Sequence, residues 1–106
     1  MVQKTVNVEN KIINDIISIA RQYSCIEKIC VFGSRARGDN KCKSDIDIAI
    51  FGNNINGIIF SAIEDSIREI NTILEFDILH FEELSKDAIK GEITKEGVVI
   101  YDKQES

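Results

Sequence analysis

The chain has 106 residues, which is enough for one domain and too few for two. Its composition is 43% hydrophobic and 29% charged with no proline, which is typical of a globular chain and excludes disordered and proline-rich classes. We therefore expect a single domain over residues 1–106, with its core at about 10–101 and a frayed tail at 102–106.

The charge balance argues against general binding to nucleic acid. Eighteen acidic residues outnumber thirteen basic ones, for a net charge of -5, so the surface as a whole repels a phosphate backbone. No apolar run reaches the roughly 18 to 20 residues of a membrane span. The first ten residues also lack the pattern of a signal peptide. We therefore expect a cytoplasmic protein with no membrane partner and no direct nucleic-acid partner.

The first half of the chain predicts a helix, a strand, a loop and a second strand. Apolar residues recur every three or four positions over 9–23, which indicates an amphipathic helix. The β-branched and aromatic run Ile26–Phe32 predicts a buried strand. The polar segment 33–44 predicts a loop with at most one helical turn, and Asp45–Phe51 predicts the next strand.

The second half predicts two more helices and two more strands. Apolar spacing indicates a helix over Gly57–Asn71, for which Asn56 is the expected N-cap. Leu74–Phe81 predicts a third strand and Glu82–Ile93 a further helix. After the glycine that ends this helix, Val98–Tyr101 predicts a short final strand.

The residue types that form disulfides or zinc sites are few and poorly spaced. The three cysteines, Cys25, Cys30 and Cys42, have no C-x-x-C or Cys/His spacing, which favours reduced thiols. Among them Cys42 has polar neighbours and is expected to be exposed. The single histidine, His80, is expected at the surface where the third strand ends.

Two aspartates stand where a strand normally avoids them. Asp45 and Asp47 are two residues apart, so they share one face of their strand while Ile46, Ile48 and Ile50 take the other. Carboxylates held this close repel each other unless a cation lies between them. Oxygen ligands without histidine or cysteine favour Mg²⁺, with Mn²⁺ as the alternative.

The third strand supplies another carboxylate. If it lies beside the second strand, Phe76 and Ile78 face the core and Asp77 turns toward the first two aspartates. Three converging carboxylates can hold two divalent ions and support in-line displacement at phosphorus. Glu75 shares that face but lies nearer the start of the strand, which makes it the less favoured ligand.

The loop before the two aspartates has the features of a phosphate site. Gly33 and Ser34 follow the first strand, where backbone N–H groups and a hydroxyl can donate to phosphate oxygens. Four basic residues follow them: Arg35, Arg37, Lys41 and Lys43. Such a loop can neutralise a triphosphate, although part of it can equally be a solvated surface run.

The arrangement of these residues resembles a known family. Gly33-Ser34, ten intervening residues and Asp45-Ile46-Asp47 match the G-S-x(10)-D-x-D signature of the polymerase-beta-like nucleotidyltransferases, and Asp77 stands where that family has its third carboxylate. The resemblance covers about residues 10–101. With GSRARGD at the head of the loop, the chain looks like a minimal nucleotidyltransferase of the kind encoded beside HEPN-domain toxins.

This resemblance implies a fold, a reaction and a partner. The implied fold is α+β (α/β), a mixed sheet with helices packed on one side. The implied reaction is Mg²⁺-dependent transfer of AMP from ATP to a tyrosine of a HEPN ribonuclease toxin, which the chain would neutralise as its antitoxin. The implied catalytic and metal-binding residues are Asp45, Asp47 and Asp77, and the implied nucleotide-binding residues are Gly33, Ser34, Arg35 and Arg37.

Three other functions compete with this interpretation. The same centre could modify a small molecule, but enzymes of that kind generally carry a further substrate domain. The chain could neutralise a toxin by stoichiometric binding alone, but a pure binder has no need of three clustered carboxylates. Template-directed polymerisation is disfavoured by the size and the acidic surface.

Overall fold

The structure is a computed structural model that describes residues 6–105. Over these residues, four helices and four strands alternate, with two short 3-10 helices. In order they are α1 (Asn10–Gln22), β1 (Lys28–Phe32), α2 (Ser34–Arg37), β2 (Ile46–Phe51), α3 (Gly57–Arg68), β3 (Phe76–His80), η1 (Phe81–Glu83), α4 (Asp87–Glu96), β4 (Val98–Asp102) and η2 (Lys103–Glu105). The expected N-cap of α3 is correct, since the Asn56 side chain accepts a hydrogen bond from the Ile59 N–H.

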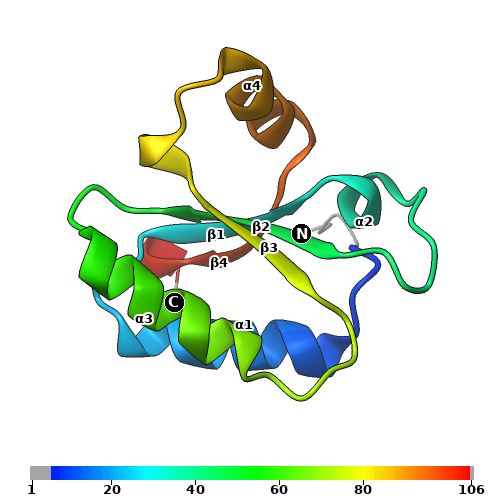
Figure 1. Ribbon diagram of the computed structural model, residues 1–106, viewed down its shortest axis with the longest axis horizontal. Helices are drawn as coiled ribbons and strands as arrows, with labels where there is room; N and C mark the ends of the chain where they lie inside the picture. Colours follow the sequence, from blue (N-terminus) through cyan, green and yellow to red (C-terminus); the bar gives the residue numbers. More distant parts are fainter. Residues whose placement is uncertain (1–5, 106) are drawn as a thin grey trace.

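The strands form one mixed sheet in the order β3-β2-β1-β4 (Figure 1). Strand β1 is antiparallel to both of its neighbours, β2 and β4, whereas β2 and β3 run parallel. The α+β class and the mixed sheet are therefore confirmed. A parallel pair needs a long crossover, and α3 provides it between β2 and β3.

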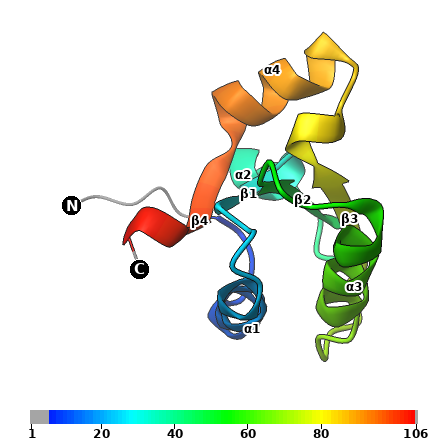
Figure 2. The same cartoon turned by 90° about the vertical axis from the view of Figure 1, so that its left-hand side faces the viewer.

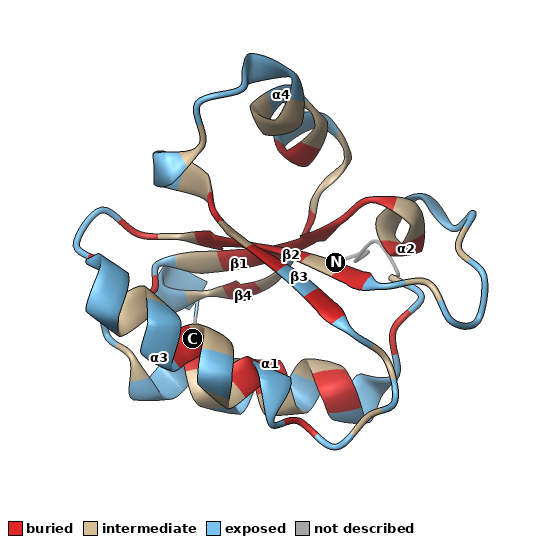
Figure 3. Ribbon diagram, viewed as in Figure 1, coloured by how far each residue is buried: buried red, intermediate tan, exposed pale blue. Residues whose placement is uncertain are grey.

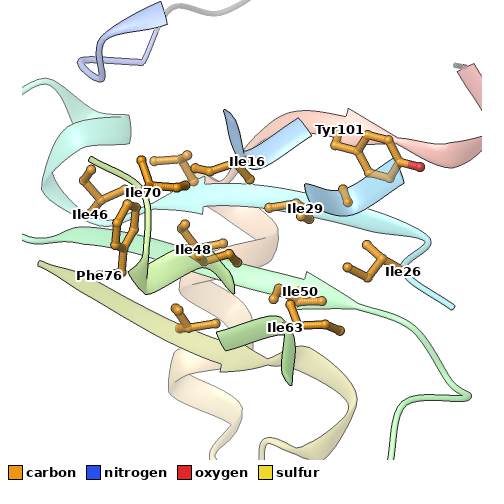
Figure 4. Packing of buried hydrophobic residues seen from close by; sticks show 14 of the residues in the cluster. Ile16, Ile26, Ile29, Ile46, Ile48, Ile50, Ile63, Ile70, Phe76 and Tyr101 are labelled. Carbon is orange, nitrogen blue, oxygen red and sulfur yellow. The ribbon is translucent and has the colours of Figure 1, made fainter. Parts of the chain in front are cut away.

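The main core lies between one face of the sheet and the helices α1 and α3 (Figures 1 and 3). Alternate residues of β2, Ile46, Ile48 and Ile50, have no exposed surface and point into this core (Figure 4). From the helices, Ile16 and Ile63 meet them with no exposed surface either. Each such side chain contributes about 1.5 to 3 kcal/mol by leaving water, so this face holds the fold together.

A smaller cluster covers the opposite face. Phe32, Ala49 and Ile93 are buried there, and α4 lies over them (Figure 2). The expectation of helices on one side therefore holds for α1 and α3 but not for α4. The reason is that the second face of β1 and β2 is itself partly apolar and needs its own cover.

Two expected elements differ at the C-terminal end. Instead of one helix over Glu82–Ile93, the chain forms η1, becomes extended at Leu84 and Lys86, and starts α4 only at Asp87. The expected frayed tail also differs, because Lys103–Glu105 form a 3-10 helix and the Lys103 N–H donates to the Glu27 carbonyl. Of that tail, Ser106 lies outside the described residues.

The prediction of a surface position for His80 is wrong. His80 is only 9% exposed, and its Nε2–H donates a hydrogen bond to the Gly52 carbonyl at 2.8 Å. Its ring stacks on Phe60, and Glu82 Oε1 lies 3.4 Å from Nε2. The histidine thus ties the turn after β2 to the end of β3, a tertiary contact that the local sequence does not signal.

The cysteines agree with what the sequence predicts of them. All three cysteines are free thiols, with Cys30 buried and Cys42 exposed. Over residues 6–105, every helix is too short or too polar to span a bilayer.

Candidate active site

The fold brings two of the predicted carboxylates side by side. Asp47 lies in β2 and is the register partner of Asp77 in the parallel strand β3. Because Ile46 and Ile48 point into the main core, Asp47 faces the side of the sheet that α4 covers. Asp47 is half-buried, whereas Asp77 and Asp45, which precedes β2, are exposed. The result is an open acidic site at one end of the sheet.

The electrostatics of Asp47 reflect this crowding. Its pKa is raised to about 6, first because burial disfavours the carboxylate and then because the charges of Asp77, Asp45 and Glu92 repel it. The positive charge of Arg37 acts in the opposite direction. A carboxylate with a raised pKa next to other acids is a place where a bound cation would relieve repulsion.

The donor set suits a hard divalent cation. The three aspartates offer only carboxylate oxygens, the ligands that Mg²⁺ and Mn²⁺ prefer. Within the described chain, no three potential ligands stand close enough together to coordinate an ion as they are. A site of this kind needs phosphate oxygens or water to complete the coordination, as is usual for Mg²⁺.

Gly33 brings the main chain directly against Asp47. Its φ of 75° and ψ of -153° fall in a region that only glycine adopts without strain. A Cβ at this position would collide with Asp47 Oδ2 and would lie 3.2 Å from its Cγ. Ser34 starts α2 at once, and the N–H groups of Ala36 and Arg37 donate to the Gly33 carbonyl. The predicted phosphate loop is therefore adjacent to the carboxylates.

Arg35 is buried, whereas its predicted role in nucleotide binding requires an exposed guanidinium. Arg35 is 6% exposed. The hydrogen bonds that its guanidinium donates all go to backbone carbonyls. Nη1 binds Asn7 O at 2.7 Å, Nε and Nη2 bind Ser44 O at 3.0 and 2.9 Å, and Nη2 also reaches Cys42 O at 3.1 Å. The side chain is thus committed to holding the loop in shape and does not offer a donor to phosphate.

We expect Arg35→Lys to destabilise the fold by about 2 kcal/mol, because lysine lacks the planar fork and leaves buried carbonyls without a donor. Urea unfolding followed by circular dichroism measures the change. The matched control is Arg21→Lys, at an exposed position in α1, which should change the free energy of unfolding by less than about 0.5 kcal/mol. Equal effects of the two substitutions would contradict a structural role for Arg35.

Arg37, by contrast, is exposed and close to the carboxylates. Its side chain is 39% exposed and forms ion pairs with Asp39 at 3.1 Å, Glu96 at 3.3 Å and Glu92 at 3.7 Å. The two glutamates come from α4 and were not singled out from the sequence, because nothing local in that helix indicates which loop it faces. The other basic loop residues, Lys41 and Lys43, are exposed.

Comparisons with known proteins identify the family and the fold. The family model described as polymerase beta, nucleotidyltransferase matches residues 14–106. A comparison with curated protein sequences gave no significant match.

Several solved structures share the fold. A chain of a toxin–antitoxin complex crystallised with AMP-PNP is 21% identical with a TM-score of 0.72, over 92% of this chain and 77% of that one. A chain of the MntA–HepT toxin–antitoxin complex is 18% identical with a TM-score of 0.68, over 92% and 75%. A third match is in a complex of a tri-AMPylated Shewanella oneidensis HEPN toxin with an MNT antitoxin, at 19% identity and a TM-score of 0.66, over 89% and 72%. With the family model covering nearly the whole chain, the protein belongs to the polymerase beta nucleotidyltransferase family.

Proposed function

We propose that this protein is a Mg²⁺-dependent protein adenylyltransferase that acts as an antitoxin in the cytoplasm. It transfers AMP from ATP to a tyrosine of a HEPN-domain toxin and so neutralises the toxin. The observation that carries the proposal is the pairing of Asp47 with Asp77 across β2 and β3, with the Gly33 main chain packed against Asp47. One of the similar solved complexes supports the choice of acceptor, because its HEPN toxin is tri-AMPylated.

The proposed reaction needs residues that hold the metal, bind the phosphates and accept a proton. Asp45, Asp47 and Asp77 hold the metal, with two ions expected, and Gly33 and Ser34 receive the phosphates through backbone N–H groups and the serine hydroxyl. When bound, Mg²⁺ draws negative charge from the attacking and leaving oxygens. Asp77, the exposed member of the strand pair, accepts the proton of the attacking hydroxyl.

The bond changes balance without another reactant. The tyrosine oxygen forms a bond to the α-phosphorus of ATP while the bond from that phosphorus to the bridging oxygen breaks. Pyrophosphate leaves, and Arg37 is the side chain placed to donate to it. The exposure of Asp45 and Asp77 supports a large acceptor, since an open site admits the side chain of another protein.

The test is to purify the protein together with a HEPN-domain toxin encoded beside it. The complex is incubated with Mg²⁺ and each labelled nucleoside triphosphate in turn, and intact mass and peptide mapping locate the label. Label on a toxin tyrosine, lost when that tyrosine is changed to phenylalanine, supports the proposal. A tight complex with no label indicates an antitoxin that acts by binding alone, and label only on a small molecule indicates a different acceptor class.

The effect of Mg²⁺ on the melting temperature can be tested without the toxin. We expect Mg²⁺ to raise the melting temperature of the wild type and EDTA to reverse the increase. A ligand at ten times its dissociation constant, bound only by the folded state, adds about 1.4 kcal/mol. Differential scanning fluorimetry measures the shift, with Asp65→Asn, an exposed carboxylate of α3, as the control that keeps it. A shift that persists in Asp47→Asn would place the ion elsewhere.

A further inference from the structure

The guanidinium of Arg37 lies between two separate segments of the chain. Asp39, two residues further along, binds Nε at 3.1 Å, while Glu96 and Glu92 of α4 bind Nη1 at 3.3 and 3.7 Å. Glu96 lies 59 positions after Arg37 in the sequence, so the contact joins the phosphate loop to the helix on the same face of the sheet. The Arg37 guanidinium thus forms ion pairs with three carboxylates.

These contacts leave one arm of the guanidinium fork available. The ion pairs use Nε and Nη1, and Nη2 donates no hydrogen bond within residues 6–105. A guanidinium presents five N–H donors in a rigid plane, so fixing two nitrogens also fixes the direction of the third. The two N–H groups of Nη2 therefore have a defined orientation and can donate to an incoming acceptor.

The helix that carries the glutamates has a firm anchor beside the site. Ile93 stands between Glu92 and Glu96, is 2% exposed, and packs with Phe32 and Ala49 on the sheet. Phe32 is the register partner of Asp47 and directly precedes Gly33. The anchor that fixes α4 is therefore built on the same strand residues that carry the carboxylate site and the phosphate loop.

Stability alone does not account for this arrangement. Ion pairs between exposed side chains contribute little to folding, and three carboxylates around one arginine also repel one another. We propose that Glu96 and Glu92 are positioning residues that hold Arg37 with Nη2 directed at the triphosphate of the bound nucleotide. The inference rests on the proposed function and adds α4 to its nucleotide site.

Removing Glu96 should change nucleotide affinity in opposite directions, depending on whether Glu96 positions Arg37 or only adds negative charge near the triphosphate. A negative charge near a triphosphate weakens its binding, so removing that charge should tighten binding if charge is all that matters. If Glu96 positions Arg37, its removal frees a long side chain whose ordering then opposes binding. The sign of the change distinguishes the two roles.

The experiment measures binding of AMP-PNP with Mg²⁺ by isothermal titration calorimetry, with melting temperatures as a check on folding. We expect Arg37→Ala to raise the dissociation constant about tenfold or more and Glu96→Ala or Glu92→Ala/Glu96→Ala to raise it about threefold to fivefold. In the Arg37→Ala background, Glu96→Ala should cause no further loss, because the residue acts only through Arg37. The matched control is Glu64→Ala, which removes the 3.5 Å partner of Arg68 on α3 at the other face of the sheet and should leave binding unchanged.

The outcomes separate this inference from the proposed function. Tighter binding by Glu96→Ala, or an equal loss with and without Arg37, overturns the positioning role while the nucleotide site stands. If the wild-type protein binds no nucleoside triphosphate with Mg²⁺, the proposed function fails and the inference fails with it. Label transfer by the wild type with unchanged affinity in Glu92→Ala/Glu96→Ala rejects the inference alone.

Discussion

Replacing Asp47 with asparagine is expected to abolish nucleotidyl transfer and, in the absence of metal, to make the fold more stable above about pH 6. The loss of transfer should exceed about a thousandfold, because Asp47 is the half-buried carboxylate next to both Gly33 and Asp77. Radiolabel transfer to the HEPN partner measures it. A variant that still transfers at a comparable rate would contradict the site.

The stability effect follows from the raised pKa of Asp47. Its pKa in the fold is about 6, against an ordinary 3.8, so the folded state binds the proton more tightly than the unfolded state. The wild type therefore loses stability as the pH rises from about 4 to about 6. Asparagine does not ionise, so Asp47→Asn does not lose this stability. The variant is therefore more stable than the wild type above about pH 6, and the difference decreases toward pH 4.

The expected gain in the free energy of unfolding is modest. A shift of this size corresponds to at most about 3 kcal/mol, and the partial exposure of the carboxylate reduces that to about 1 kcal/mol. Urea unfolding in EDTA at pH 4 to 8 tests it, with Asp65→Asn, the same substitution at an exposed position of α3, as the control. If Asp47→Asn unfolds instead, Asp47 is a structural residue and its assignment to the metal is wrong.

Gly33→Ala is expected to damage both the fold and the reaction. A non-glycine residue at φ 75° and ψ -153° costs about 1 to 3 kcal/mol, and the added Cβ collides with the Asp47 carboxylate. We expect a destabilisation of about 3 kcal/mol and a loss of transfer similar to that of Asp47→Asn. Thermal unfolding and the label-transfer assay measure the two effects.

A second glycine provides the control for Gly33. Gly91 lies inside α4, and a Cβ there meets nothing within 4 Å, so Gly91→Ala should stabilise the protein by up to about 1 kcal/mol. Combining Gly33→Ala with Asp47→Ala removes the collision but not the backbone strain. The cost of Gly33→Ala should therefore be smaller in that background, and an unchanged cost would mean that the two residues do not touch.

The carboxylate geometry could be predicted from the sequence because a strand alternates its faces. The isoleucines of β2 must face the core, which fixes the side on which Asp47 stands, and the same argument applied to Phe76 and Ile78 turns Asp77 to that side. Only the parallel pairing of β2 with β3 had to be supplied by the fold. Periodicity is a local property: it predicts which face of its strand each side chain takes, but not which strands are neighbours.

The two arginines of the phosphate loop show where local reasoning ends. Arg35 and Arg37 have the same charge and similar neighbours in sequence, yet one is buried against backbone carbonyls and the other lies exposed between carboxylates. The partners that separate them, Asn7 and Glu96, are distant in sequence. No pattern in the loop itself predicts which arginine remains available to a ligand.

The internal contacts of Arg35 also account for the length of the phosphate loop. Its guanidinium binds the carbonyls of Cys42 and Ser44, which lie at the end of the ten-residue interval between Ser34 and Asp45. A residue inserted or deleted in that interval would move these carbonyls off the fixed fork of donors and shift the start of β2 relative to Gly33. In this chain the ten-residue spacing is therefore held by a buried arginine, and the positions of Asp45 and Asp47 depend on a side chain that lies outside the site.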